Sequence, residues 1–217
     1  MNRVGRTWAM ALLVGFAAIM GAVAAGWTAA PDQATAIAAA THRTAFLSEV
    51  AINMTALGSG PVVVAIALLV AAYAIASGRP RMVLAVVWTP LAFLLDSLFK
   101  LLLHHPRPTV AMIALPPDYS FPSGHAVAAS ALYVTLAMIA ASAERRAGPR
   151  RLLIASGIVV ALVVAWSRVY LGVHYLSDVV AGLMLGSAGA IVAARAVSAR
   201  PNIDGETDRQ GLSDSGA

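Results

Sequence analysis

The chain has 217 residues, of which 59% are hydrophobic and only 12% charged, and it contains no cysteine. Soluble domains carry about 25% charged residues, so this composition excludes an ordinary water-soluble globule and is typical of a bundle of membrane helices. The absence of cysteine excludes disulfides and thiolate metal sites. The fourteen arginines and one lysine lie in small groups between apolar runs, which indicates membrane topology rather than nucleic acid binding.

Six apolar runs approach the length of about 20 residues that a membrane-spanning helix needs. In chain order these runs cover residues 8–30, 61–77, 82–103, 126–143, 152–170 and about 176–197. The first run leaves two alternatives open. Residues 22–24 read Ala-Val-Ala, which resembles the cleavage site of a signal peptide that would end near Ala24. The apolar run continues beyond this point, which favours a retained helix.

Two segments outside the apolar runs have a different composition. Residues 31–60 mix polar and apolar side chains, which favours a helix lying along the membrane surface over a further span. Residues 201–217 are rich in Gly, Ser and Asp, and we expect them to form a disordered cytoplasmic tail. We find no internal repeat, so we expect one membrane domain over residues 1–200, with its motifs within residues 61–197.

The distribution of basic residues predicts the orientation in the membrane. Six spans place both termini on one side. If that side is the cytoplasm, eleven basic residues are cytoplasmic and four are not, as the positive-inside rule requires. The four exceptions are Arg43, Lys100, Arg107 and Arg168. Three of them belong to the polar clusters described next, so they have another reason to lie at the outer side.

Three polar clusters occur at the predicted extracytoplasmic ends of the spans. They read KLLLHHPRP (residues 100–108), FPSGH (121–125) and SRVYLGVHYLSD (167–178). Ionisable groups at the ends of spans are costly and are therefore candidates for function. The clusters are far apart in sequence, but we expect the helix ends to bring them together.

The spacing within the clusters has chemical consequences. His174 and Asp178 are four residues apart, on one face of a helix, so the carboxylate can hold one ring nitrogen and leave the lone pair of the other facing the site. Gly172 lets the chain turn before His174. Ser123 and the amides around Gly124 begin the fourth span, where the helix N-terminus favours an anion.

The basic residues of the clusters predict a bound anion. Lys100, Arg107 and Arg168 would repel one another beside a low-dielectric wall unless about two negative charges lay among them, and a phosphate monoester is the natural occupant. Asp96, four residues before Lys100, is expected to orient that lysine. His104 and His105 are expected to be loop or interface residues. For Asp118 and Tyr119, solvation in a loop is favoured over contact with a substrate head group. Helix capping or interfacial anchoring explains any single cluster residue, but not all of them in register.

Together the clusters resemble the three motifs of the type 2 phosphatidic acid phosphatase superfamily: Lys, six residues, Arg-Pro; Pro-Ser-Gly-His; and Ser-Arg, five residues, His, three residues, Asp. Every signature position is filled, in order. The resemblance implies an all-α, integral membrane six-helix bundle with its active site at the extracytoplasmic helix ends. Soluble vanadium-dependent haloperoxidases share the constellation, and six spans argue against that branch.

The resemblance also implies roles for the motif residues. His174 would attack phosphorus and form a phosphohistidine, with Asp178 orienting its ring, and His125 would protonate the leaving alkoxide and then activate water. The phosphate oxygens would be bound by Lys100, Arg107, Ser123, the Gly124 amide and Arg168. No metal or other cofactor is expected.

The expected function is hydrolysis of a lipid phosphate or diphosphate at the membrane. Phosphatidic acid, phosphatidylglycerol phosphate and polyprenyl diphosphate all remain open as substrates, because the motif positions do not contact the lipid tail. The alternative is a protein of the same fold that binds or transports lipid phosphates without hydrolysis. The expected partners are this substrate and the surrounding membrane lipids, and no nucleic acid. The small-residue run 181–190 suits close helix packing, within the molecule or between copies in a homo-oligomer.

Overall fold

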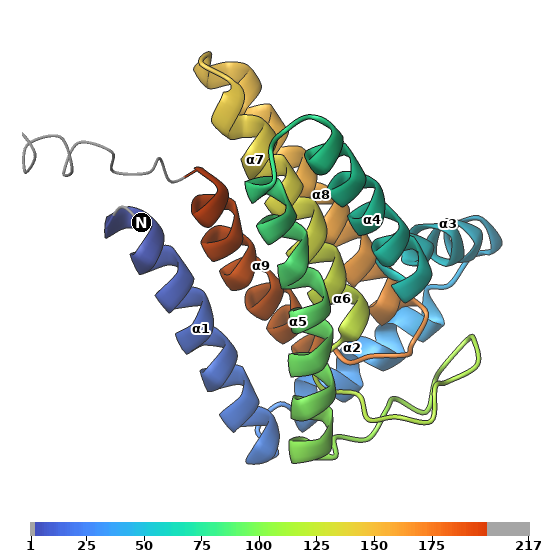
Figure 1. The fold of residues 1–217 in the computed structure, drawn as a ribbon. Coiled ribbons are helices and arrows are strands. Elements are labelled where there is room, and N and C mark those ends of the chain that lie inside the picture. Colours follow the sequence, from blue (N-terminus) through green and yellow to red (C-terminus); the bar gives the residue numbers. More distant parts are fainter. Residues whose placement is uncertain (1–2, 199–217) are drawn as a thin grey trace, which may run out of the picture.

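The computed structural model describes residues 3–198, and within that range every regular element is a helix (Figure 1). The elements in chain order are α1 (Arg3–Ala24), α2 (Ala29–Thr41), α3 (Ala45–Thr55), η1 (Ala56–Gly58), α4 (Gly60–Ala76), α5 (Arg81–Leu103), α6 (Gly124–Ala129), η2 (Ser130–Val134), α7 (Thr135–Ala143), α8 (Ala147–Tyr170) and α9 (Leu176–Ser198). The segments α6, η2 and α7 form one rod, with η2 a single π-helical turn. The predicted all-α fold is confirmed.

The predicted number of membrane spans agrees with the long helices. Five helices of the described range are long and apolar enough to cross a membrane: α1, α5, the α6–α7 rod, α8 and α9. A sixth span results if α3 with η1 and α4, which meet at 46°, are counted together. Helix α4 alone has 17 residues, with a turn of Gly and Ser before it. The molecule is therefore built as a bundle of up to six spans, as expected.

The structure corrects the predicted course of the chain between the first two spans. The first helix ends at Ala24 and not at residue 30, because Gly26 adopts a left-handed backbone conformation (φ 75°) that stops it. The segment that follows forms two helices, α2 and α3, where one had been expected. The break lies just before Thr44, whose hydroxyl caps α3 by accepting a hydrogen bond from the amide of Leu47 at 3.2 Å. That the segment of α2 and α3 lies along the membrane surface remains a prediction. The expected tail, residues 201–217, lies outside the described residues.

Helix α9 lies at the centre of the bundle, in contact with α1, α5, α6, α7 and α8. Its glycines allow this close packing. A Cβ atom on Gly182 would lie 2.8 Å from the backbone oxygen of Ser123, and one on Gly186 would overlap the hydroxyl of Ser130. The small-residue run of the sequence therefore packs α9 against the start of α6 within the molecule, which fixes the relation between two of the three motifs.

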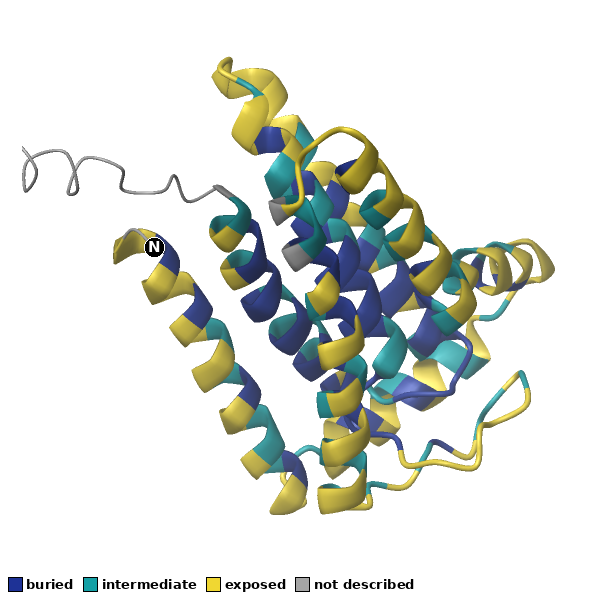
Figure 2. Ribbon diagram, viewed as in Figure 1, coloured by how far each residue is buried: buried dark blue, intermediate teal, exposed yellow. Residues whose placement is uncertain are grey.

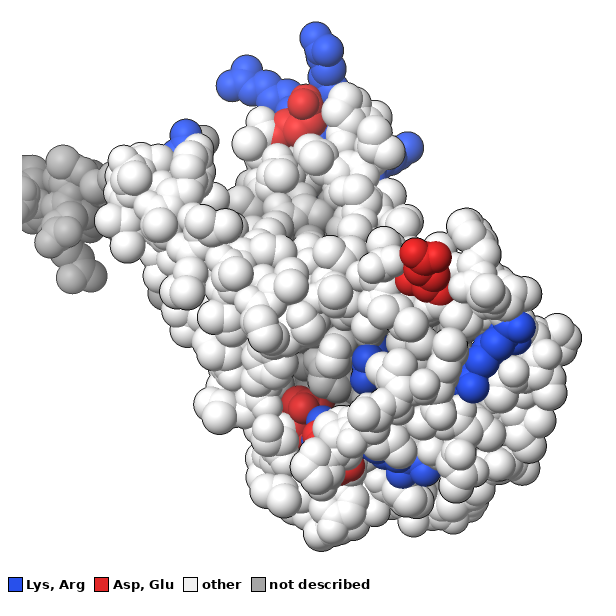
Figure 3. Space-filling view, turned by 90° about the vertical axis from the view of Figure 1, so that its right-hand side faces the viewer, with Lys and Arg blue, Asp and Glu red and all other residues white. Residues whose placement is uncertain are grey.

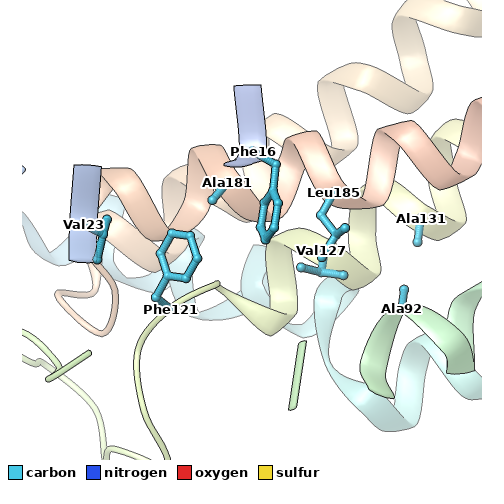
Figure 4. Packing of buried hydrophobic residues seen from close by; sticks show 8 residues of the cluster. All are labelled: Phe16, Val23, Ala92, Phe121, Val127, Ala131, Ala181 and Leu185. Carbon is cyan, nitrogen blue, oxygen red and sulfur yellow. The ribbon is translucent and has the colours of Figure 1, made fainter. Parts of the chain in front are cut away.

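Apolar packing also fixes the loop that enters α6. Figure 4 shows Phe121 packed among side chains of α1, α5, α6 and α9, in a cluster that includes Phe16 and Leu185. The rings of Phe16 and Phe121 lie 5.9 Å apart. Because Phe121 is fully buried only two residues before Ser123, the packed core determines where the second motif begins.

The outer surface of the bundle remains apolar. Figure 2 shows that buried residues concentrate on the inner helices, whereas α1, α4 and α5 expose one face each. The side chains on these faces include the exposed leucines Leu68, Leu69, Leu94, Leu101 and Leu102. An exposed apolar face of this extent is typical of a surface covered by lipid.

Candidate active site

The three motifs meet at one end of the bundle, where α5 and α8 end and α6 and α9 begin. Hydrogen bonds to backbone carbonyls join them directly. The amide of Ser123 donates to the carbonyl of Asp178 at 3.0 Å, and Nη1 of Arg107 donates to the carbonyl of Val173 at 2.8 Å. The expectation that helix ends bring the distant clusters together is therefore met.

The imidazole of His174 and the carboxylate of Asp178 form a buried pair. Nδ1 of His174 lies 3.5 Å from Oδ2 of Asp178. The two side chains meet as predicted, but they do not share a helix, because His174 lies in the turn before α9 begins at Leu176. Ser120 connects the two side chains, with its hydroxyl 3.2 Å from that Nδ1 and 2.5 Å from that Oδ2. The other oxygen, Oδ1, lies 3.1 Å from Nδ1 of His105. These contacts fix the carboxylate, which in turn fixes the plane of the His174 ring.

The remaining ring nitrogen of His174 faces Arg107. Nη1 of Arg107 lies 3.1 Å from Nε2 of His174. A guanidinium has no acceptor, so Nε2 must accept and the ring proton must reside on Nδ1, toward Asp178. Burial lowers the pKa of His174 to about 4, against the opposing influence of Asp178, and the charges of Arg168 and Arg107 act in the same direction as burial. His174 is thus neutral at pH 7, and its Nε2 keeps the unprotonated lone pair that a nucleophile requires, which here accepts the hydrogen bond from Arg107.

Lys100 and Arg107 are paired with carboxylates of the chain itself. Nζ of Lys100 lies 3.2 Å from Oδ2 of Asp96, which confirms the expected pair, and 2.5 Å from Oδ2 of Asp118. Nη2 of Arg107 lies 2.5 Å from Oδ1 of Asp118. Although partial burial opposes it, the hydrogen bonds from Lys100 and Arg107 lower the pKa of Asp118, so this carboxylate is ionised. The expected self-repulsion of the cations is therefore relieved in part by the protein.

Two residues lie in loops as expected but make contacts that the sequence did not reveal. Asp118 was expected to be a solvated loop residue, yet it bridges two motif cations. His105 was expected to be a loop or interface residue, yet it holds the carboxylate of Asp178. The cause is that the loop folds back on itself, with the amide of Ser120 donating to the carbonyl of His105 at 2.8 Å. The same fold explains why Ser120 was missed.

Ser123 begins α6 without capping it. It occupies the N-cap position, but its side chain makes no capping hydrogen bond. Its hydroxyl oxygen is buried and has no partner among the described residues. The adjacent Gly124 lies against Asp96, since a Cβ there would be 3.0 Å from Oδ2 of that carboxylate. The simple interpretation of Ser123 as a helix cap is therefore wrong, and a free hydroxyl remains at the start of α6.

Arg168 and His125 complete the cluster. Arg168 is 5% exposed, and its Nη1 donates to the hydroxyl of Thr55 at 2.8 Å, while its Nε has no partner among the described residues. His125 lies within the electrostatic range of four groups of the site, namely Arg168, His174, Lys100 and Arg107. The two histidines and three cations predicted from the motifs therefore lie at the same end of the bundle.

The turn before His174 is held from outside the motifs. Gly172 has φ 69°, which confirms its expected role in the turn, and a Cβ there would lie 2.6 Å from both Nη2 of Arg43 and the carbonyl oxygen of Val110. Arg43 donates from Nε to the carbonyl of Tyr170 at 3.1 Å and from Nη2 to that of Val110 at 2.8 Å. Arg43, the fourth basic residue expected on the outer side, thus binds backbone carbonyls around the site.

Comparison with known proteins places these residues in a family. The sequence model of the PAP2 superfamily matches residues 81–202. An undecaprenyl-diphosphatase of Sulfolobus acidocaldarius is 43% identical over 81 residues, which are 37% of this chain and 35% of that protein. A phosphatidylglycerophosphatase B of Bacillus subtilis is 33% identical over 94 residues, 43% of this chain and 46% of that protein. The matched regions thus span less than half the length of these curated relatives.

The fold also has a solved counterpart. The crystal structure of a transmembrane PAP2 type phosphatidylglycerolphosphate phosphatase from Bacillus subtilis superposes with a TM-score of 0.79 and 25% identity, covering 85% of this chain and 93% of that one. This likeness to a transmembrane protein, with the apolar helices described above, makes the present protein a multi-pass membrane protein. The family match covers more than half of the sequence and contains all three motifs, and the chain belongs to the PAP2 superfamily.

Proposed function

We propose that the protein is a membrane phosphatase that hydrolyses a lipid phosphate or diphosphate through a phosphohistidine on His174. The observation that carries the proposal is the opposed contact of Asp178 on Nδ1 and Arg107 on Nε2 of that ring. This arrangement leaves a nucleophilic lone pair directed at a cation that binds phosphate. The names of the similar proteins, which are an undecaprenyl-diphosphatase and a phosphatidylglycerol phosphate phosphatase of Bacillus subtilis, support the same class of reaction.

The first chemical step forms a bond between Nε2 of His174 and phosphorus. Arg107 transfers its hydrogen bond from Nε2 to a phosphoryl oxygen as the substrate arrives. Lys100, Arg168, the Ser123 hydroxyl and the Gly124 amide bind the remaining oxygens, where negative charge accumulates in the transition state. The bond from phosphorus to the leaving oxygen breaks, and His125 protonates that oxygen. Asp178 stabilises the positive charge that develops on the ring of His174.

The second step releases inorganic phosphate. His125 removes a proton from a water molecule, which attacks the phosphohistidine in line, and the P–N bond breaks to restore neutral His174. Three cationic side chains supply the charge that a metal ion supplies in many phosphatases. We therefore expect a metal chelator to leave the rate unchanged.

The site is proposed to face the extracytoplasmic side, with both chain termini in the cytoplasm. Eleven of the fifteen basic residues then lie on the cytoplasmic side, in agreement with the positive-inside rule. Figure 3 supports this assignment, since basic side chains project from the end of the molecule where α7 meets α8, and the site lies at the opposite ends of these helices. We also propose a single membrane domain over residues 1–200.

The decisive experiment is a phosphate-release panel on the purified protein. The substrates are phosphatidic acid, phosphatidylglycerol phosphate, a prenyl monophosphate and a prenyl diphosphate, each assayed with and without a chelator. We expect release from at least one of them, unchanged by the chelator and abolished in His174→Ala. Full activity in His174→Ala would refute the nucleophile. Binding of these lipids without release by the wild type would favour the non-hydrolytic alternative, for which no present observation speaks.

A further inference from the structure

The three cations of the site are balanced by two carboxylates of different character. Asp96 is 5% exposed, belongs to α5 and pairs with Lys100 one helical turn away, so it stays in place. Asp118 belongs to the loop between α5 and α6, and its side chain is 41% exposed. It bridges Lys100 and Arg107 with one oxygen on each, 2.5 Å from both. Two oxygens of one anionic group on two motif cations is the contact expected of a phosphate.

We propose that Asp118 is an intramolecular competitor of phosphate, whose carboxylate occupies the binding positions on Lys100 and Arg107 and must be displaced by the phosphoryl group of the substrate. The inference rests on the proposed function for its biological meaning, but the competition itself concerns only anion binding. Asp118 lies outside the three motifs and acts on the reaction through Lys100 and Arg107.

The loop is built so that the carboxylate can leave while the backbone stays. Arg107 donates from Nε to the carbonyl of Asp118 at 3.1 Å and from Nη2 to the carbonyl of Tyr119 at 3.2 Å. The ring of Tyr119 packs edge-on against His104 at 4.5 Å. These contacts hold residues 118 and 119 independently of the side chain of Asp118, so rotation of that side chain into solvent leaves the loop anchored.

Competition of this kind has a consequence for turnover. If Asp96 were the only carboxylate paired with its cations, the site would hold inorganic phosphate more tightly after hydrolysis. A carboxylate that returns to Lys100 and Arg107 favours release of this product, and it lowers the affinity for substrate by the same competition. Exposed ion pairs contribute modestly, so we expect the removal of Asp118 to strengthen phosphate binding about three- to tenfold.

The test compares Asp118→Asn with the wild type in detergent. Asparagine keeps the size of the side chain and removes its charge. Glu49→Gln serves as the matched control, because Glu49 is an exposed carboxylate on α3, outside the contacts of the site. Two quantities are measured for each protein: the dissociation constant of inorganic phosphate from its effect on thermal unfolding, and KM, kcat and product inhibition with the best lipid substrate.

The expected result is a lower dissociation constant for phosphate, a lower KM and stronger product inhibition in Asp118→Asn, with Glu49→Gln like the wild type. If Asp118 instead only positions Lys100 and Arg107, Asp118→Asn will bind phosphate more weakly and raise KM, which overturns the inference. Equal phosphate affinity in all three proteins also overturns it, even if the wild type hydrolyses lipid phosphates. Tighter phosphate binding in Asp118→Asn without turnover in any protein supports the competition and refutes only the proposed function.

Discussion

The hydroxyl of Ser123 stands at the N-cap of α6, is fully buried and makes no hydrogen bond within the described residues. A buried hydroxyl without a partner costs about 1–3 kcal/mol, so the Ser123 hydroxyl does not stabilise the structure without substrate. A role in binding a ligand would explain its presence. Binding of a phosphoryl oxygen is that role in the mechanism proposed above. Because this hydroxyl makes no capping bond, removing it distinguishes a catalytic role from a structural one.

We predict that Ser123→Ala lowers kcat/KM about 10- to 100-fold while leaving the thermal stability unchanged or slightly raised. The activity falls because a donor to the transition state is lost. Stability does not fall because no capping bond is broken. Phosphate release and thermal unfolding in detergent measure the two effects. A loss of stability of about 1 kcal/mol with activity intact would identify a helix cap instead.

The role of His125 is tested by the leaving group of the substrate. We predict that His125→Ala slows phosphohistidine formation from a lipid phosphate far more than from an aryl phosphate, because an aryl oxide leaves without protonation and an alkoxide does not. Single-turnover rates for both substrates measure the difference. Equal losses on the two substrates would argue against His125 as the acid.

Single residues differ in how far their contacts were predictable. The pairing of Asp96 with Lys100 follows from a spacing of four on a helix, where geometry is fixed by the backbone. The predicted pairing of His174 with Asp178 also occurs, but His174 lies in the turn before α9, so helix geometry is not its cause. The contacts of Ser120, His105 and Asp118 follow from the course of an irregular loop, which no periodicity encodes. The only signal in the sequence was the polar character of residues 118–120, which read DYS just before the second motif.

At the scale of elements, the short helices α2 and α3 support the helix ends that carry the candidate active site. Asp32 of α2 is buried and accepts hydrogen bonds from the amide of Ser177 at 2.9 Å and from its hydroxyl at 2.6 Å. It thereby caps α9 at the residue directly before Asp178. Thr55 of α3 orients Arg168 in a comparable way. These contacts join residues more than 100 positions apart, so the sequence alone did not reveal them.

We predict that Asp32→Ala destabilises the protein by about 1–3 kcal/mol and lowers kcat more than it raises KM, because the start of α9 carries Asp178 and not a phosphate ligand. Asp32→Asn retains one acceptor for the amide of Ser177, so its stability and kcat should lie between those of the wild type and Asp32→Ala. Thermal unfolding and steady-state kinetics of the three proteins measure both effects. An unchanged kcat in Asp32→Ala would show that α9 needs no support from α2.

Helix boundaries show where element prediction succeeds. The ends of α5, α8 and α9 near the site agree with the predicted runs to within a residue or two, because Pro, Gly and charged residues follow the apolar stretches. The end of α1 was placed six residues too late. Small apolar residues continue past Ala24, so hydropathy alone did not register the turn at Gly26.

At the scale of the whole molecule, hydropathy was sufficient to predict the bundle but not its packing. Apolar runs of about 20 residues determine that the chain crosses a membrane, since unpaired backbone groups are not tolerated in lipid. The central place of α9 depends on glycines at 182, 186 and 189, where a Cβ would collide with atoms of the neighbouring helices. Which helix each glycine faces is a property of the assembled bundle.

The orientation of this bundle in the membrane makes the last prediction. The chain has no cysteine, so a single cysteine introduced into it is the only thiol available. We predict that Ala114→Cys, in the exposed loop beside the site, reacts with a membrane-impermeant maleimide on intact cells, because that loop lies on the side with few basic residues. Ser142→Cys, exposed at the arginine-rich end of α7, should react only after lysis. The opposite pattern would place the site in the cytoplasm and restrict its substrates to phosphates of the inner leaflet.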